Sequence, residues 1–590
     1  MSIKAFFTTF ALTPLLMAVT PAPIAAQSTL PAMPTADAPI IDYQNRYLPA
    51  YGKAGMVVSP EALSGEIGLA ILKEGGNAVD AAVATGFALA VTLPRAGNIG
   101  GGGFMLIHLA ETNEQVFVDY RETAPAAATR DMFLKEDGSV DQSKAYFSHQ
   151  AAGVPGTVAG LLKAQERFGA LSRSEVMAPA IRLAEQGFAV YPVLADSLKR
   201  AAPLLQADPS AKAIYYKANG EPYRAGEILR QPLLAATLRR IAEQGRPGFY
   251  QGPVAEKLEA LMQQRGGLID RQDLAAYRAP WVEPVQGNFR GLKVLSMPPP
   301  SSGGVTLIQM LNLLEPFDLA GMGLNSAESI HTLVEAMNLA YRDRNSELGD
   351  PDQVEVPVQM LTSKAYANSL RSLIRPQRHT PSADLGGTAP LPANSTNTTH
   401  LSVADQQGSL VALTTTLNFA YGNGVAIPGT GVLLNNEMDD FTSKPGVPNA
   451  YGLVQGEKNA IAPGRRPLSS MTPTVVLNAN GGPWLATGTP GGSRIITTVL
   501  QVLLNRMVHG LNLATSVLSP RIHSQLWPDR VQIEQGISPD TINLLEQWGH
   551  AIQRSRAMGS ANSVEVQTSG GSLGVADPRR PEGAAIPQQP

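Results

Sequence analysis

The chain has 590 residues and a formal net charge of −3, with 44% hydrophobic and 16% charged residues. This composition is typical of a globular protein with a large core, and the near-neutral charge provides no basic face for phosphate backbones. We therefore expect no nucleic-acid partner. The sequence contains no cysteine, which excludes disulfides, thiolate nucleophiles and cysteine-based metal sites.

The first residues have the pattern of a secretory signal peptide. Lys4 precedes an apolar run over residues 5–19, and small residues follow up to Ala26. Because the run is short for a spanning helix and ends in small residues, we expect cleavage after Ala26; an uncleaved anchor is the alternative. No later segment is long and apolar enough to span a bilayer. The sequence thus predicts a periplasmic or secreted protein with no stable membrane span once the signal is removed.

The segments that follow predict two helices and a pair of strands. Ser-Pro-Glu at residues 59–61 indicates a helix start with the serine as N-cap, and the glycines at 75–76 end this helix. Residues 78–91 are almost entirely apolar, which predicts a helix buried on most faces. A glycine run at 97–103 then leads into a buried strand, for which residues 116–120 are the expected partner. The run lacks the spacing of a dinucleotide-binding loop, so we expect no cofactor there.

From about residue 150 to 285 the chain has helical periodicity, and further helices are expected at 305–314 and 326–341. Residues 376–397 then consist mainly of Pro, Ser, Thr, Gly and Asn, and nothing there could bury a face, which predicts a flexible linker. Threonine- and valine-rich strands follow the linker. Strands interleaved with helices in both halves suggest a sheet sandwich covered by helices.

The linker leads into a predicted β-hairpin. Residues 405–408 form a turn between two β-rich runs. If the turn centres near residues 406–407, Thr398 lies opposite Thr415 or Thr416. A polar linker therefore ends at a threonine that begins a strand and has a second hydroxyl across from it.

This arrangement suits a nucleophile that is released by cleavage. A threonine hydroxyl attacks poorly unless a base takes its proton, and a free α-amino group with a pKa of about 8 can be that base on the same residue. The catalyst would exist only after the bond between Asn397 and Thr398 is broken. The same hydroxyl could break it, by attacking the Asn397 carbonyl to give an ester that water opens. Threonine-rich hairpins are also common as plain structure, so the spacing alone leaves both interpretations open.

Residues 398–422 resemble the signature of the γ-glutamyltransferase family, and the resemblance extends from about residue 45 to 580. In the signature itself, the matching residues are Thr398-Thr399-His400, Ser402, Gly408-Ser409, Val411, Thr414, Thr416-Leu417-Asn418 and Tyr421-Gly422. Further matching motifs are Gly100 to Gly103, Arg121-Glu122 with Ala124-Pro125, Asn435-Asn436 with Met438-Asp439-Asp440, Arg466 to Met471, and Pro490 to Arg494.

The resemblance implies an α/β (α+β) fold, the four-layer αββα sandwich of the N-terminal nucleophile hydrolases. A large subunit, residues 27–397, and a small catalytic subunit, residues 398–590, would be interwoven in one core as a heterodimer made from one precursor. The implied reaction cleaves the γ-glutamyl amide bond of glutathione through a γ-glutamyl-threonine ester. Water, an amino acid or a peptide would accept the group.

The catalytic roles that the resemblance implies fall on four residues. Thr398 would be the nucleophile with its own amine as base, and Thr416 would hydrogen-bond it. Gly491 and Gly492 would offer backbone N–H groups to the oxyanion, a stabilisation of about 3 kcal/mol per donor in other acyl-transfer sites. The eight histidines are scattered without paired ligand spacing, so no metal is expected.

The substrate would be recognised by its charged end. A γ-glutamyl group carries an α-carboxylate and an α-amine away from the scissile bond. Arg121 suits bidentate carboxylate recognition, and the hydroxyls of Ser469 and Ser470 could add to it. As alternatives, Arg121 could form a structural ion pair with Glu122 or another acid, and the two serines could form a simple turn.

The ammonium would be met by acceptors, namely Asn418, Glu437 and Asp440. Several bacterial members have Gln at the position of Glu437, so we expect the extra carboxylate to be tolerated and to change fine substrate preference. Residues 445–456 resemble the lid of many bacterial members, with Tyr451 as its gate; an ordinary surface loop is the alternative.

Two other functions compete with this interpretation. The first is a sister amidase of the same architecture, such as a cephalosporin acylase or a poly-γ-glutamate-processing enzyme. The second is a noncatalytic secreted binding or scaffold protein. The arginine, serines and acids expected at the substrate's charged end favour a free glutamyl head group over both.

Overall fold

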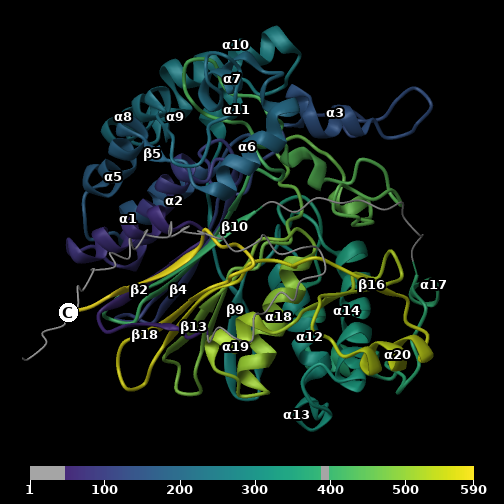
Figure 1. Ribbon diagram of the computed structural model, residues 1–590. Coiled ribbons are helices and arrows are strands. Elements are labelled where there is room, and N and C mark those ends of the chain that lie inside the picture. Colours follow the sequence, from purple (N-terminus) through teal and green to yellow (C-terminus); the bar gives the residue numbers. More distant parts are fainter. Residues whose placement is uncertain (1–46, 387–397) are drawn as a thin grey trace, which may run out of the picture. The chain divides into compact units, whose positions relative to one another are not determined.

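The structure is a computed structural model that describes residues 47–386 and 398–590 (Figure 1). These residues belong to one compact unit of the chain. The predicted signal peptide and Asn397 lie outside the described residues.

Two seven-stranded sheets form the centre of the unit, and every pairing within them is antiparallel. In spatial order the first sheet contains β1 (Ala50–Gly52), β18 (Ser572–Ala576), β17 (Asn562–Val566), β13 (Pro483–Thr487), β12 (Thr474–Leu477), β9 (Leu292–Ser296) and β8 (Val285–Phe289). The second contains β19 (Ala584–Gln588), β2 (Gly55–Ser59), β10 (Thr399–Ala404), β11 (Leu410–Thr416), β3 (Gly102–Leu109), β4 (Glu114–Asp119) and β7 (Trp281–Val282). Both sheets combine strands from before and after Thr398, so the two predicted subunits share one core.

Apolar side chains on both faces of the strands explain why the sheets stack. In β2, Met56 and Val58 point into the core between the two sheets, whereas Val57 between them packs against the outer helices. In β12, Val475 faces the inter-sheet core and Val476 faces the other way. Because successive side chains of a strand point to opposite faces, strands that are apolar throughout require cover on both sides.

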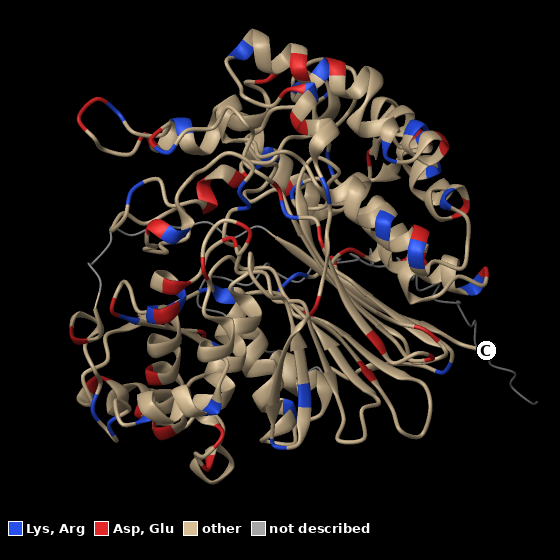
Figure 2. Cartoon of the chain, turned by 180° about the vertical axis from the view of Figure 1, so that it is seen from behind, with Lys and Arg blue, Asp and Glu red and all other residues tan. Residues whose placement is uncertain are grey.

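Helices supply this cover on each outer face and complete a four-layer αββα sandwich (Figure 1). The helices over the second sheet are α1 (Ala62–Lys73), α2 (Ala78–Thr92), α4 (Thr157–Phe168), α5 (Arg173–Gln186), α6 (Pro192–Leu205), α7 (Pro209–Tyr215), α8 (Pro232–Gln244), α9 (Pro247–Tyr250), α10 (Gly252–Arg265) and α11 (Arg271–Ala276). Those over the first sheet are α12 (Gly303–Leu314), α13 (Leu319–Met322), α14 (Ala327–Glu347), α16 (Lys364–Arg371), α18 (Arg494–Met507), α19 (Leu513–Leu518) and α20 (Pro539–Gln547). Figure 2 shows charged residues mainly on these helices and their loops, with few on the strands.

Smaller elements complete the structure. They are the helices α3 (Gln142–Phe147), α15 (Val358–Leu361) and α17 (Ser382–Leu385), the 3-10 helices η1 (His149–Ala151), η2 (Glu437–Asp440) and η3 (Glu457–Asn459), the three-stranded sheet of β14 (Ile522–His523), β15 (Val531–Ile533) and β16 (Ile552–Arg554), and the pair β5 (Phe188–Ala189) and β6 (Ile228–Leu229).

Two predicted boundaries are wrong. Helix α1 begins at Ala62, and its N-cap is Glu61, whose carboxylate accepts hydrogen bonds from the N–H groups of Leu63 and Ser64 at 2.9 Å. Ser59 instead ends strand β2. A glutamate can act as an N-cap because its side chain also reaches the unpaired N–H groups of a first helical turn.

The predicted linker over 376–397 is also structured in its first part. His379, Thr380 and Ser382 are buried, and the His379 N–H donates to the Trp548 carbonyl at 2.8 Å. These short polar side chains are anchored by hydrogen bonds to residues distant in sequence, which composition alone does not reveal. None of the helices in residues 47–386 and 398–590 combines the length and apolar character that a membrane crossing requires.

Candidate active site

The register of the predicted hairpin places two threonine hydroxyls together. Thr399 pairs with Thr415 across β10 and β11, so Thr398, one residue earlier, lies opposite Thr416. Their Oγ1 atoms are 3.4 Å apart, and both residues are buried. The Thr416 Oγ1 also accepts a hydrogen bond from the Asn418 N–H at 2.9 Å. The predicted juxtaposition is confirmed.

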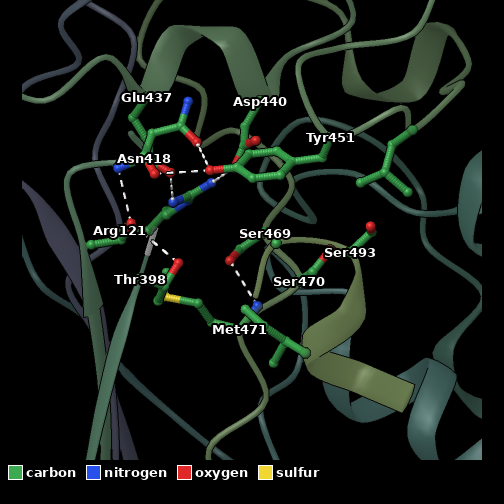
Figure 3. Close-up of a pocket in the computed structure, with 14 residues that line it drawn as sticks. Arg121, Thr398, Asn418, Glu437, Asp440, Tyr451, Ser469, Ser470, Met471 and Ser493 are labelled. Carbon is green, nitrogen blue, oxygen red and sulfur yellow. Dashed lines mark hydrogen bonds and ion pairs between the residues drawn. The ribbon is translucent and has the colours of Figure 1, made fainter. Parts of the chain in front are cut away.

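Thr398 lies in a pocket that gathers residues from distant parts of the chain (Figure 3). All the described residues predicted for the site line it except Gly491, which precedes Gly492 in the chain. The predicted lining residues are Arg121, Thr398, Thr416, Asn418, Glu437, Asp440, Tyr451, Ser469, Ser470 and Gly492.

The turn before α18 contains the two glycines that were predicted as oxyanion donors. Gly491 and Gly492 have φ angles of +145° and +58°, which favour glycine. A Cβ atom on Gly492 would lie 2.2 Å from the ring of Tyr451, so no larger residue fits there. Since unpaired N–H groups at a helix N-terminus attract negative charge, this turn is suited to an oxyanion.

Arg121 follows strand β4 and is fully buried. Its guanidinium forms ion pairs with Glu437 and Asp440, and Glu122 lies 3.6 Å away. Burial favours the neutral form of the arginine, but these carboxylates outweigh it and raise the pKa of Arg121. The residues predicted for the carboxylate and for the ammonium of a substrate thus neutralise each other within the pocket. Arg121 is therefore both a member of the pocket and a partner in buried ion pairs.

Burial also changes the protonation of the acids around Arg121. It raises the pKa of Glu122 to about 7 despite the nearby Arg121, and it raises the pKa values of Glu437 and Asp439 well above their usual range. An acid with a raised pKa keeps its proton at higher pH. Of the acids around Arg121 only Glu437 and Asp440 line the pocket, and the raised pKa of Glu437 reduces the negative charge of this lining near neutral pH.

Tyr451 closes one side of the pocket. Its ring packs against Gly492, and its hydroxyl lies 2.6 Å from Oδ1 and 2.8 Å from the backbone oxygen of Asn418. The Asn449 Oδ1 accepts hydrogen bonds from the N–H groups of Tyr451 and Leu453 at 3.0 and 3.1 Å. The predicted lid is therefore an internally bonded loop with Tyr451 pointing inward (Figure 3).

The structure adds Arg344, which the sequence analysis missed. It lies on α14, is 1% exposed, and donates to the hydroxyls of Ser470 at 3.2 Å and Ser302 at 3.0 Å. It also donates to Oε1 of Gln455 in the lid at 3.1 Å. Burial lowers the pKa of Arg344 to about 10. The sequence predicts that this helix ends at residue 341, whereas α14 extends to Glu347. Extending the predicted helix by one turn would have placed Arg344 on its buried face.

Ser469 and Ser470 are held by the loop that precedes α12. The Ser302 N–H donates to the Ser469 carbonyl at 2.8 Å, and the Ser469 Oγ accepts from the Met471 N–H at 3.0 Å. These contacts fix the backbone while the two residues still line the pocket. Both serines are buried, so this segment is not an exposed surface turn.

A buried threonine at the start of a central strand, paired with a second hydroxyl in an αββα sandwich, defines the class of N-terminal nucleophile hydrolases. The comparisons with known proteins agree. The sequence model of the family described as gamma-glutamyltranspeptidase matches residues 64–586, and the chain belongs to that family.

Individual relatives support this assignment. The glutathione hydrolase proenzyme of Escherichia coli (strain K12) is 49% identical over 546 residues, which are 92% of this chain and 94% of that protein. The crystal structure of cephalosporin acylase from Bacillus halodurans superposes with a TM-score of 0.83 at 28% identity, covering 93% of this chain and 98% of that one. Helicobacter pylori gamma-glutamyltranspeptidase is 45% identical with a TM-score of 0.56, and the match covers 58% of this chain and 97% of that chain. The predictions of family, enzyme class and fold are confirmed.

Proposed function

We propose that the chain cleaves itself before Thr398 and then hydrolyses or transfers the γ-glutamyl group of glutathione and related compounds. The observation that supports this most is the position of Thr398. Its hydroxyl lies 3.4 Å from that of Thr416 and in the same pocket as a buried arginine and acids suited to an amino-acid head group. The signal-like N-terminus supports a location in the periplasm or outside the cell.

Processing uses the hydroxyl before the amine exists. The Thr398 Oγ1 attacks the Asn397 carbonyl carbon, the peptide C–N bond breaks, and an ester forms while the freed amine takes up the proton. Water then hydrolyses the ester, which leaves a carboxylate on Asn397 and an unmodified Thr398 at a new N-terminus. Thr416 orients the hydroxyl in this step.

Catalysis then repeats the same chemistry on a substrate. The Thr398 amine takes the hydroxyl proton, Oγ1 attacks the γ-carbonyl carbon, and the N–H groups of Gly491 and Gly492 stabilise the oxyanion. The γ-amide bond breaks, the leaving amine receives the proton, and a γ-glutamyl ester remains on Thr398. Water resolves the ester to free glutamate, and the amine of an amino acid or peptide resolves it to a new γ-glutamyl amide.

Recognition exchanges one set of ion pairs for another. The substrate α-carboxylate takes the place of the acids at Arg121, helped by Ser469 and Ser470, and the α-ammonium is bound by Glu437 and Asp440. Asn418 contributes a further acceptor. Because a zwitterion supplies one charge of each sign, the pocket stays neutralised when it binds. A glutamyl residue whose α-amine is in a peptide bond lacks the positive charge. The pocket should reject it, because Glu437 and Asp440 would then be buried without a cation to pair with.

A gel and two substrates test the proposal. Purified protein should give two bands of about two-thirds and one-third of the chain, with the smaller beginning at Thr398. The processed enzyme should release product from a γ-glutamyl anilide and much less from a glutaryl amide, which lacks the α-amine. Unprocessed protein that is active would contradict the mechanism.

The similarity to the cephalosporin acylase supports a second candidate function, the hydrolysis of an amide whose acyl group has no α-amine. Preference for the glutaryl amide would establish that function instead. The buried acids beside Arg121 favour the γ-glutamyl donor, because a glutaryl group offers them no cation.

A further inference from the structure

A buried cluster of histidines and acids lies outside the active site, against helix α14. His331 and Glu335 stand four residues apart on α14, which places them on the same face of the helix. His550, between α20 and β16, packs against them. All three residues are less than 4% exposed. The ligand atoms that they offer lie within 4.8 Å of one another.

Hydrogen-bond partners fix the proton positions on one ring. The Nε2 atom of His331 lies 2.7 Å from the Arg375 carbonyl oxygen, which can only accept, so Nε2 carries the proton. The Nδ1 atom of His331 therefore has a lone pair, and it points at Nε2 of His550 at 2.8 Å. The other ring nitrogen of His550 is buried and has no hydrogen-bond partner among the described residues.

We propose that Nδ1 of His331, Nε2 of His550 and a carboxylate oxygen of Glu335 form a binding site for a divalent transition-metal ion such as Zn²⁺. Two imidazoles and one carboxylate are a known ligand set for zinc, with water at the fourth position. At zinc–ligand distances of about 2.0–2.1 Å, tetrahedral ligand atoms are about 3.3 Å apart. The two imidazole nitrogens need to separate by only about 0.5 Å to reach this geometry. The proton now shared between them would move to the free nitrogen of His550.

The surroundings of His331 and Glu335 resemble those of metal ligands. A metal-bound histidine usually donates its second ring N–H to a carbonyl or carboxylate, and His331 does so to Arg375. The Thr380 N–H lies 3.2 Å from Oε2 of Glu335 and orients this carboxylate. Nitrogen ligands favour a transition metal over Mg²⁺ or Ca²⁺, which prefer oxygen.

One neighbour competes with the ion. The ring of His379 donates to Oε1 of Glu335 at 2.8 Å and to Oδ1 of Asp529 at 2.9 Å. Because both partners are carboxylates, His379 is held as a cation beside the site. The other carboxylate oxygen of Glu335 is therefore the one available to the metal.

The site would join two parts of the chain. His331 and Glu335 precede Thr398 in sequence and His550 follows it, so a bound ion would hold the two predicted subunits together. This consequence depends on the proposed processing, whereas metal binding itself does not. Local sequence patterns do not reveal the site, because His550 lies far along the chain from His331 and Glu335.

Metal content and thermal stability test the proposal on the full protein. After incubation with Zn²⁺ and dialysis, mass spectrometry should find one bound zinc per chain, and micromolar Zn²⁺ should raise the Tm by several degrees while Mg²⁺ does not. Both effects should disappear in His331→Ala and in His550→Ala. They should persist in His509→Gln, which changes a half-buried histidine outside the cluster.

A measurement on the wild type covers the case in which these variants fail to fold. Co²⁺ in place of Zn²⁺ should give the intense visible absorption of a tetrahedral site, and excess Zn²⁺ should remove it. No zinc retained by the folded wild type, no cobalt band, or equal retention by the cluster variants would each overturn the proposal. Activity on a γ-glutamyl anilide is measured separately, and its loss or survival does not bear on the metal result.

Discussion

Two regions meet in the pocket and are built in different ways. One is the hairpin that carries Thr398, and the other is the charged wall of the pocket, which consists of Arg121 and the acids around it, Glu122, Glu437 and Asp440. The hairpin is local: its pairing brings Thr398 opposite Thr416 through neutral hydroxyls on adjacent strands. The wall is assembled from segments hundreds of residues apart, and Arg121 reaches Glu437 and Asp440 across 316 and 319 positions. Position is fixed by register in the first region and by charge in the second.

The difference indicates how each region should respond to change. A hydroxyl pair in a sheet contributes little to stability, about 1 kcal/mol, so its loss should remove chemistry and leave the fold. Buried charges that neutralise one another are coupled, and removal of one leaves its partners unpaired at a cost of about 3–5 kcal/mol. Changes in the wall should therefore affect binding and stability together.

The largest effect is expected at Thr398. Thr398→Ala should remain a single chain with no detectable activity, because no hydroxyl is left to attack Asn397 or a substrate. Its Tm should stay within a few degrees of the wild type. A denaturing gel, a γ-glutamyl anilide assay and a thermal melt measure these outcomes. Thr398→Ser is the matched control and should still process, and two bands from the alanine variant would break the assigned role.

Arg121→Gln should lower kcat/KM for glutathione by about 100-fold or more, since truncating a buried charge pair costs about 2–5 kcal/mol. It should also lower the Tm, in contrast with Thr398→Ala. Arg130→Gln is the control, because Arg130 pairs with the largely exposed Glu457, and such pairs contribute little. Steady-state kinetics on processed protein that match the wild type would remove Arg121 from the binding wall.

Arg344→Gln should raise KM about 10-fold with a smaller change in kcat. The buried cation positions Ser470 and the lid residue Gln455, and a hydrogen bond from a charged group contributes about 1.5–3 kcal/mol. Arg344→Lys should recover part of the loss, and Arg342→Gln, on the more exposed face of α14, should change little. If kcat instead fell by about 10-fold while KM stayed unchanged, the result would argue against a positioning role for Arg344.

Glu122→Gln tests the protonation of the wall and should have the smallest effect. Burial raises the pKa of Glu122 from near 4.5 to about 7. As pH rises through this window, the unfolded chain releases the proton before the folded one, so the wild type loses stability. The uncharged Gln avoids this loss, and it should stabilise the protein relative to the wild type by about 1–3 kcal/mol more at pH 8 than at pH 5. Urea unfolding at both pH values measures the difference, and a pH-independent difference would contradict the assignment.

Local patterns predicted much of the fold. The turn at residues 405–408 set the hairpin register, and the apolar run at 78–91 predicted a helix whose 15 residues are all buried. These predictions succeeded because a turn and the pattern of apolar residues along a helix both depend on residues that are close together in the sequence. The first part of the predicted linker was misjudged, because His379 and Ser382 are fixed by residues about 150 positions away.

By itself, the sequence predicted the nucleophile and its partner across the hairpin, and it indicated the family to which the chain belongs. These follow from motifs and strand register, which are encoded over short stretches. Only the tertiary structure showed that Arg121 is neutralised by the acids expected to face a substrate and that Arg344 donates to Ser470. It also showed that His550 lies beside His331 and Glu335, where we propose a metal site. Contacts of this kind depend on which buried groups come within a few ångströms of each other, and the free energy of burying a charge is decided by that proximity.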